Sequence, residues 1–197
     1  MNAGAARVVL ASTSRYRAEL LRRLLPEFQQ AAAQVQETEI PGETPRRRAE
    51  RLALLKAAAV AGSCDHSLVI GSDQVAELNG RVLHKPGKLA VAREQLRACS
   101  GREVHFHTAV CVIDTRRADR RSLFADLTRV RFRPLDDGEI QRYLEREQPL
   151  DCAGSFKSEA LGITLFEKIE SEDPTALIGL PLIALARLLR EAGLNLP

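Results

Sequence analysis

Tryptophan is absent from the 197-residue sequence, and aromatic residues make up only 4% of it. Proteins that bind single-stranded nucleic acids commonly stack the bases on aromatic side chains. A large excess of one charge is absent too, because 29 basic and 26 acidic residues leave a net charge of +3. We therefore expect no nucleic-acid partner, whereas anionic small molecules suit this mild positive surplus.

Cysteine is scarce, and the four cysteines include no CxxC pair and have no histidine at zinc-finger spacing. This pattern favours reduced thiols in a cytoplasmic protein. Long hydrophobic runs are also missing. The longest, 176–186, contains Gly179 and Pro181 and is too short to span a bilayer. No signal-type apolar segment precedes Ser12, so we expect neither a membrane anchor nor export.

What is present is ordinary for a globular protein, with 45% apolar and 28% charged residues in a length that suits one domain, 1–197. The expected strands span 7–11, 68–71, 75–78, 81–83, 104–114, 123–133 and 163–169, and the expected helices span 15–25, 45–61, 89–99, 136–144 and 181–192. Strands and helices alternate first, and antiparallel hairpins follow. The sequence thus predicts an α/β fold with a mixed, strongly bent sheet flanked by helices, forming two lobes with a central cleft.

A first candidate site lies where the strand 7–11 gives way to a helix, at Ser12, Thr13 and Ser14 followed by Arg17. Free backbone N–H groups and the positive end of the helix dipole favour anions there, and hydroxyls and a cation add donors for phosphate. The alternative is simple N-capping by Ser14 with exposed arginines. The glycines of a P-loop are absent.

Asp73 is the second candidate, because it directly follows an apolar strand, and ligands of α/β sheets bind at the carboxyl ends of strands. The alternative is an aspartate that caps a turn. Lys56 lies on the mostly apolar face of the helix 45–61, where it either finds a partner or extends to solvent. Lys85 precedes Pro86, which favours an extended backbone, and is otherwise a solvated loop lysine.

The segment 152–159 is a further candidate, because its small residues and Gly154 suit close approach to a ligand and Glu159 offers an acceptor. An ordinary surface loop is the alternative. Together the candidates supply hydroxyls, cations and carboxylates without a convincing covalent nucleophile. This set fits hydrolysis of a phosphate anhydride by water, with a divalent ion, Mg²⁺ first, neutralising charge.

These residues in this order resemble the Maf family of nucleotide pyrophosphatases, whose fold is of the Maf/ITPase type, over nearly the whole chain. The matching positions are Leu10-Ala11-Ser12-Thr13-Ser14 with Arg17, Glu39, Lys56, Gly71-Ser72-Asp73-Gln74-Val75, Lys85-Pro86 and the loop around Gly154. The stretches 152–159 and 179–183 resemble the subfamily that hydrolyses 7-methyl-GTP. The loop typical of the dTTP/UTP subfamily is absent.

The resemblance implies a metal-dependent enzyme, using Mg²⁺ or Mn²⁺, that converts a nucleoside triphosphate to the monophosphate and pyrophosphate. It implies that Asp73 is a metal ligand and either the proton acceptor that activates water or an orienter of the metal-bound water, and that Glu39 is a second metal ligand. The triphosphate ligands that it implies are Ser12, Ser14, Arg17, Lys56 and Lys85, and the specificity residues are Tyr16, Gln74 and Glu159. Physically, Tyr16 suits stacking on a cationic 7-methylguanine, and Glu159 suits the donors on the guanine edge.

One departure from the family pattern lies at the first motif, where the usual Ser-Pro-x-Arg reads Ser14-Arg15-Tyr16-Arg17. Two alternatives to a 7-methyl-GTP pyrophosphatase follow: a dTTP/UTP pyrophosphatase, and a nucleotide-binding division regulator without turnover. The expected partner is a small nucleotide, with a homodimer as a possible assembly.

Overall fold

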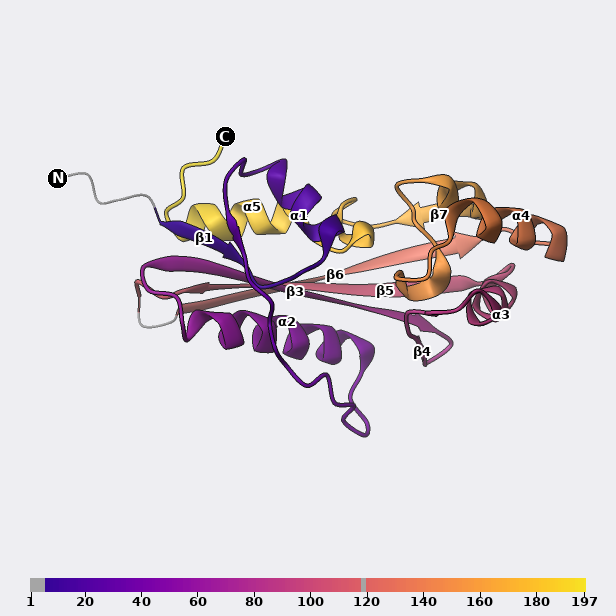
Figure 1. Ribbon diagram of the computed structural model, residues 1–197, viewed down its shortest axis with the longest axis horizontal. Coiled ribbons are helices and arrows are strands. Elements are labelled where there is room, and N and C mark those ends of the chain that lie inside the picture. The colour runs from indigo at the N-terminus through magenta and orange to yellow at the C-terminus, as the bar shows by residue number, and fades with distance from the viewer. Residues whose placement is uncertain (1–5, 118–119) are drawn as a thin grey trace. The chain divides into compact units, whose positions relative to one another are not determined.

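The computed structural model describes residues 6–117 and 120–197 (Figure 1). Its strands form one sheet in the order β2-β1-β3-β5-β6-β7, with β4 paired to β3. The strands are β1 (Arg7–Leu10), β2 (Gln29–Gln30), β3 (Ser67–Leu78), β4 (Arg81–Leu83), β5 (Glu103–Asp114), β6 (Arg120–Phe132) and β7 (Phe166–Glu170). β1 is parallel to β2 and β3, whereas β4 is antiparallel to β3 and β7 to β6. The predicted α/β fold with a mixed sheet is confirmed.

Helices account for most of the remaining regular structure. They are α1 (Arg15–Arg22), α2 (Pro45–Ala61), α3 (Leu89–Cys99), α4 (Asp137–Glu147) and α5 (Leu182–Glu191), with short 3-10 turns η1 (Ala153–Ser155), η2 (Leu161–Leu165) and η3 (Ala176–Ile178). Within the described residues, no helix is both long enough and apolar enough to cross a membrane.

Contacts divide the chain into two compact units. Unit 1 is made from Met1–Gln74, Thr108–Asp126 and Asp173–Pro197, and unit 2 from Val75–His107 and Leu127–Glu172. The strands β3, β5 and β6 each contribute residues to both units. The prediction of one domain whose lobes share a cleft stays a prediction.

Unit 1 packs helices on both faces of its strands, with α2 on the face opposite to α1 and α5 (Figure 1). Alternate residues of β3 determine this arrangement, because side chains of a strand point to opposite faces in turn. Leu68 and Ile70 join the buried cluster that contains leucines of α1 and α5. Gly71, on the other face, lies against the backbone of α2.

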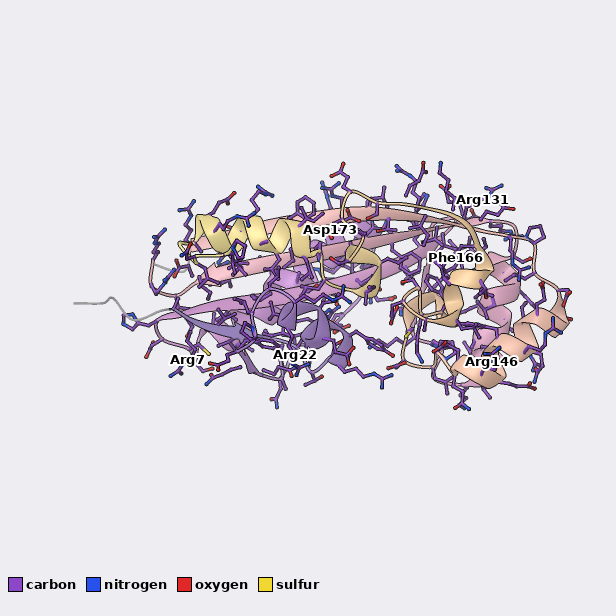
Figure 2. The ribbon with its side chains drawn as sticks, turned by 90° about the horizontal axis from the view of Figure 1, so that it is seen from above. Arg7, Arg22, Arg131, Arg146, Phe166 and Asp173 are labelled. Carbon is purple, nitrogen blue, oxygen red and sulfur yellow. The ribbon has the colours of Figure 1, made fainter. Side chains whose placement is uncertain are left out.

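Unit 2 has an aromatic centre. Phe106, Phe132, Phe156 and Phe166 form edge-to-face pairs with ring centroids 4.8 to 5.6 Å apart. Figure 2 labels Phe166, the first residue of β7. Such pairs add about 0.5–1.5 kcal/mol each beyond the area they bury. This cluster connects β5, β6 and β7 to the segment that follows η1.

Several predicted elements are confirmed because their signals are local. Thr44 accepts a hydrogen bond from Arg47 N at 3.3 Å and caps α2, which ends before Gly62. The turn at 79–80 joins β3 to β4, and Asp136 with Glu139 forms the predicted capping box of α4.

Several predicted boundaries are wrong, among them the end of α4, which continues to Glu147 instead of ending at 144. The first helix ends at Arg22 rather than 25, because Arg23 and Leu24 form tighter turns, each donating to the carbonyl three residues back, before Pro26. Residues 161–165 form η2, so the last strand begins only at Phe166. Asp73 does not follow the end of a strand. It lies inside β3, which continues to Leu78 because residues on both of its faces are buried.

Candidate active site

The junction between β1 and α1 gathers two serine hydroxyls and one guanidinium. Ser14 Oγ accepts a hydrogen bond from Arg17 N at 3.5 Å and caps α1, which confirms N-capping by Ser14, but Arg17 is only partly exposed, unlike the exposed arginines of that interpretation. Ser12 Oγ accepts from Ser14 N at 3.2 Å and from Arg17 Nη1 at 3.4 Å. A hydroxyl that accepts in this way keeps its own hydrogen as a donor. The junction therefore combines capping with donors suited to an anion.

Lys56 of α2 and Asp73 of β3 form an ion pair in unit 1. Lys56 Nζ lies 2.6 Å from Asp73 Oδ1, and their side chains are only 13% and 9% exposed. Lys56 Nζ also lies 2.6 Å from Glu37 Oε1. The lysine on the apolar face of α2 thus has two carboxylate partners, and the interpretation in which it extends to solvent is wrong.

Burial has the largest effect on the pKa values of Asp73 and Arg17. Desolvation raises the pKa of the Asp73 carboxyl above its ordinary value, and the nearby Lys56 and Arg17 cations oppose that rise. Desolvation likewise lowers the pKa of the Arg17 guanidinium, while the Asp73 and Glu37 carboxylates raise it. These couplings place Arg17, Lys56, Glu37 and Asp73 in one electrostatic cluster. A carboxylate with a raised pKa is a better proton acceptor than one in water.

Close packing of α2 on β3 brings Lys56 to Asp73. A Cβ atom added to Gly71 would lie 2.6 Å from Ala57 N and closer still to Ala53 O. Only a glycine allows the two backbones this approach. Because Gly71 is two residues from Asp73 and Ala57 follows Lys56, the same contact determines the distance between the charged side chains.

Tyr16 and Gln74, two of the expected specificity residues, have partners within unit 1. The Arg15 guanidinium lies 4.7 Å from the centre of the Tyr16 ring and donates to its hydroxyl at 2.7 Å. Gln74 Nε2 lies 3.0 Å from the carbonyl oxygens of Ala176 and Leu177. The amide of Gln74 therefore contacts backbone groups of the protein itself.

Lys85 and Glu159, the other expected ligands, belong to unit 2 and are both exposed. Lys85 lies in the loop between β4 and α3. Glu159 ends the segment 152–159, which is not an ordinary surface loop, because Gly154, Ser155 and Phe156 are buried.

The glycine of this segment serves packing. A Cβ atom on Gly154 would lie 3.0 Å from the Phe106 ring, and its φ of 77° favours glycine. Lys157 Nζ donates to Glu147 Oε1 at 3.0 Å and anchors the chain two residues before Glu159. Gly154 therefore packs against an aromatic ring, and its approach to a ligand stays a prediction.

A comparison with protein families decides where this chain belongs. The model of the Maf-like protein family matches residues 7–192. The chain belongs to the Maf-like family.

Curated relatives of this Maf-like protein match it over nearly their full lengths. A protein of Xanthomonas oryzae pv. oryzae is 58% identical over 192 residues, covering 97% of this chain and 99% of the relative. One from Aromatoleum aromaticum is 54% identical over 191 residues, covering 97% and 98%. Both relatives are named 7-methyl-GTP pyrophosphatase. Among solved structures, a HAM1 protein from Coxiella burnetii is 14% identical with a TM-score of 0.48, covering 94% of this chain and 99% of that one.

In this Maf-like protein, Glu37 rather than Glu39 contacts the lysine beside Asp73. Glu39 is 65% exposed, and its Oε1 lies 2.7 Å from Arg48 Nη1. Sequence reasoning missed Glu37, and no local pattern could have found it, because both glutamates lie in a segment without regular secondary structure. What distinguishes the two glutamates is the contact of Glu37 with Lys56, which lies 19 positions further along the chain.

Proposed function

We propose that this chain is a nucleoside triphosphate pyrophosphatase that hydrolyses 7-methyl-GTP to 7-methyl-GMP and pyrophosphate. The names of relatives up to 58% identical support this substrate. The observation that carries the mechanism is the 2.6 Å contact of Lys56 Nζ with Asp73 Oδ1 in a nearly buried environment. It supports the proposal, because the Asp73 carboxyl, whose pKa is raised, lies near the Lys56 and Arg17 cations, whose charges would suit a triphosphate.

In the proposed reaction, the Asp73 carboxylate accepts a proton from a water molecule. The water oxygen forms a bond to the α-phosphorus, and the bond from that phosphorus to the bridging oxygen breaks, so that pyrophosphate leaves. Lys56 and Arg17 stabilise the negative charge that develops on the phosphate oxygens. Ser12 and Ser14 donate their hydroxyl hydrogens to the triphosphate, and we include Lys85 of unit 2 among its ligands.

The donors of the cluster fit a divalent cation, Mg²⁺ or Mn²⁺, on which pyrophosphatases generally depend. Glu37 and Asp73 touch the same ammonium nitrogen, so two carboxylate oxygens lie near one another. Within residues 6–117 and 120–197, no group of three or more His, Cys, Asp or Glu side chains is arranged to hold a metal. Mg²⁺ commonly takes one or two carboxylates together with substrate phosphates and water. Glu37 and Asp73 would hold the ion, which when bound neutralises triphosphate charge.

Base selection is assigned to Tyr16, Glu159 and Gln74. Tyr16 would stack on the base, and a cationic 7-methylguanine strengthens such stacking. Glu159, anchored through Lys157, would accept hydrogen bonds from the guanine edge. Gln74 is the third position that the family resemblance marks for specificity.

A panel of nucleotides assayed for pyrophosphate release with Mg²⁺ tests this function. We expect 7-methyl-GTP to be hydrolysed with a higher kcat/KM than GTP, dTTP or UTP, and we expect Glu159→Gln to reduce the preference for 7-methyl-GTP over UTP. Faster hydrolysis of UTP or dTTP by the native protein would establish the dTTP/UTP alternative. Nucleotide binding without release of pyrophosphate would instead establish a binding module, such as a division regulator.

A cytoplasmic location is part of the proposal and is supported by the thiols. None of the four cysteines, all of which lie in the described part of the chain, forms a disulfide, and Cys99 and Cys111 are buried. Burial raises the pKa of the Cys111 thiol to about 11, which keeps it protonated and unreactive. Cell fractionation tests the location. Sedimentation of the purified protein tests the predicted homodimer.

A further inference from the structure

A turn before α5 is held by side chains from two neighbouring strands of unit 1. Gln74 Nε2 of β3 lies 3.0 Å from the carbonyl oxygens of both Ala176 and Leu177. Thr108 of β5 donates its hydroxyl hydrogen to Ala176 O at 3.0 Å, and its Oγ1 lies 3.0 Å from Gln74 Nε2. Thr108 is fully buried. The two side chains therefore form one network that fixes η3 against the sheet.

The far side of the same turn is fixed by Asp173, which is labelled in Figure 2. Asp173 Oδ1 accepts from the Thr175 hydroxyl at 2.7 Å, and Oδ2 accepts from Ile183 N at 2.7 Å. Asp173 is only 2% exposed. Buried charge-assisted hydrogen bonds are among the strong ones in proteins, so η3 is held between the sheet and the start of α5.

The carbonyl of Gly179, which directly follows η3, connects the turn to the candidate active site. Gly179 O accepts from Arg17 Nε at 2.9 Å. Ser72 Oγ lies 3.0 Å from Gly179 O and 2.8 Å from Ala109 O, so its one hydroxyl hydrogen is shared between the two carbonyls. Ser72 is fully buried and directly precedes Asp73. A φ of 125° at Gly179 is a conformation that side chains rarely allow, so the orientation of this carbonyl depends on glycine.

These contacts use the N–H groups on one edge of the Arg17 guanidinium and leave those on the other edge available to a ligand. A guanidinium has five N–H groups in a rigid plane. The bonds to Gly179 O and Ser12 Oγ engage Nε and one hydrogen of Nη1. Because the plane is rigid, the direction of the Gly179 carbonyl determines where the remaining N–H groups point.

We propose that Ser72, Gln74 and Thr108 are positioning residues that act on the substrate through Arg17, by holding the 176–179 turn so that the Gly179 carbonyl orients the guanidinium toward the triphosphate. This inference rests on the proposed function, in which Arg17 is a triphosphate ligand. Ordering the arginine before the substrate binds removes part of the entropy cost of binding. Gln74 then affects the reaction through the turn and not by contacting the base.

Two ligands separate this role from base recognition. Pyrophosphate carries the anionic tail without a base, and 7-methylguanosine carries the base without a tail. We expect Gln74→Met and Thr108→Val to weaken binding of pyrophosphate with Mg²⁺ about tenfold, the scale of one lost hydrogen bond, and to leave 7-methylguanosine binding unchanged. Titration calorimetry measures both. Weaker binding of the nucleoside to Gln74→Met would show that Gln74 reads the base and would overturn the proposal.

A double-mutant cycle tests whether the effect passes through Arg17. In an Arg17→Met background, Thr108→Val should cause no further loss of pyrophosphate affinity, because the group that it orients has been removed. Equal losses in both backgrounds would overturn the proposal, since a general structural effect adds to the loss of Arg17. Thr108→Ser, which keeps the donor, should restore affinity to within about twofold of the native protein. If Thr108→Val does not fold, Gln74→Met carries the same cycle.

Kinetics of the Mg²⁺-loaded enzyme extend the test to the reaction. Thr108→Val should raise KM for 7-methyl-GTP about tenfold and change kcat less, because Asp73 and its contacts remain. Failure of the native protein to hydrolyse 7-methyl-GTP would refute the proposed function alone, since the pyrophosphate cycle does not involve the base. An intact hydrolytic activity with additive losses in the cycle would refute the positioning role alone.

Discussion

Burial of the Asp73 side chain has two opposing effects. Its burial raises the pKa of the carboxyl, which improves a proton acceptor, yet the same burial makes the ionised form costly. Lys56 and Arg17 offset part of that cost, as the order of the effects on the pKa shows. Replacing Asp73 should therefore change the free energy of unfolding as well as the hydrolytic activity.

Asp73→Asn should abolish most hydrolysis, about 10²- to 10⁴-fold in kcat, because the proton acceptor is lost, while nucleotide binding persists. The variant should also be more stable than the native protein at neutral pH. A folded-state pKa above the unfolded value means that the native protein loses stability as pH rises from the unfolded pKa through the folded one. The gain should therefore vanish in acid. Thermal unfolding from pH 3 to 8, without metal, measures it.

Asp65→Asn is the matched control for this prediction, because Asp65 is an exposed aspartate of unit 1 just before β3. It should leave the hydrolytic activity unchanged. A native level of hydrolysis in Asp73→Asn would contradict the assignment of Asp73 as the proton acceptor.

Glu37 and Glu39 offer a second comparison of single residues. Glu37 shares Lys56 with Asp73, whereas Glu39 pairs with Arg48. We expect Glu37→Gln to raise the Mg²⁺ concentration that gives half-maximal activity about tenfold or more, a typical effect of weakening a metal site. Glu39→Gln should leave it unchanged. The opposite result would favour the assignment of Glu39 that the family resemblance implied.

At the scale of the elements, the contact between α2 and β3 matters most. Gly71 lets the two backbones approach, and the approach brings Lys56 to Asp73. Helix α2 carries the lysine and strand β3 the aspartate, so the site depends on how these two elements pack.

Gly71→Ala tests this contact. The added methyl group would overlap Ala53 O and Ala57 N, so α2 must move away from β3. We expect a loss of about 1–3 kcal/mol in the free energy of unfolding, as for other overpacked cores, together with a lower kcat. Gly62→Ala at the end of α2 is the control, because its nearest contact is Ala58 O at 4.0 Å. Denaturant titrations compare the two, and equal stabilities would contradict the role of Gly71.

The same elements show what the sequence can predict. The ends of α2 follow from Thr44, Pro45 and Gly62, which act within one turn of the chain. The position of Asp73 inside β3 was not predictable, because polar residues at 72–74 resemble the end of a strand. Partners distant in sequence keep them in the sheet, such as Ala109 O, which lies 2.8 Å from Ser72 Oγ. Glu37 was missed for the same reason, since its role depends on a contact made only after folding.

At the scale of the whole molecule, the path of the chain couples the two units. It crosses between them four times, and three of these crossings lie inside β3, β5 and β6. Unit 1 is therefore assembled from three separate segments, and its strands are continuous with those of unit 2. A strand that loses its pairing in one unit frees residues that directly continue into the other.

We therefore expect the units to unfold in one cooperative transition, as a single domain does. Because the chain has no tryptophan, Phe28→Trp reports on unit 1 alone and Phe166→Trp on unit 2 alone. Both positions are partly buried, so the fluorescence of a tryptophan there should change on unfolding. The two fluorescence transitions in urea should share one midpoint, and circular dichroism of each variant should coincide with its fluorescence. Separate midpoints would show that the units unfold independently, because one half of a shared strand would then unfold while its other half stayed folded.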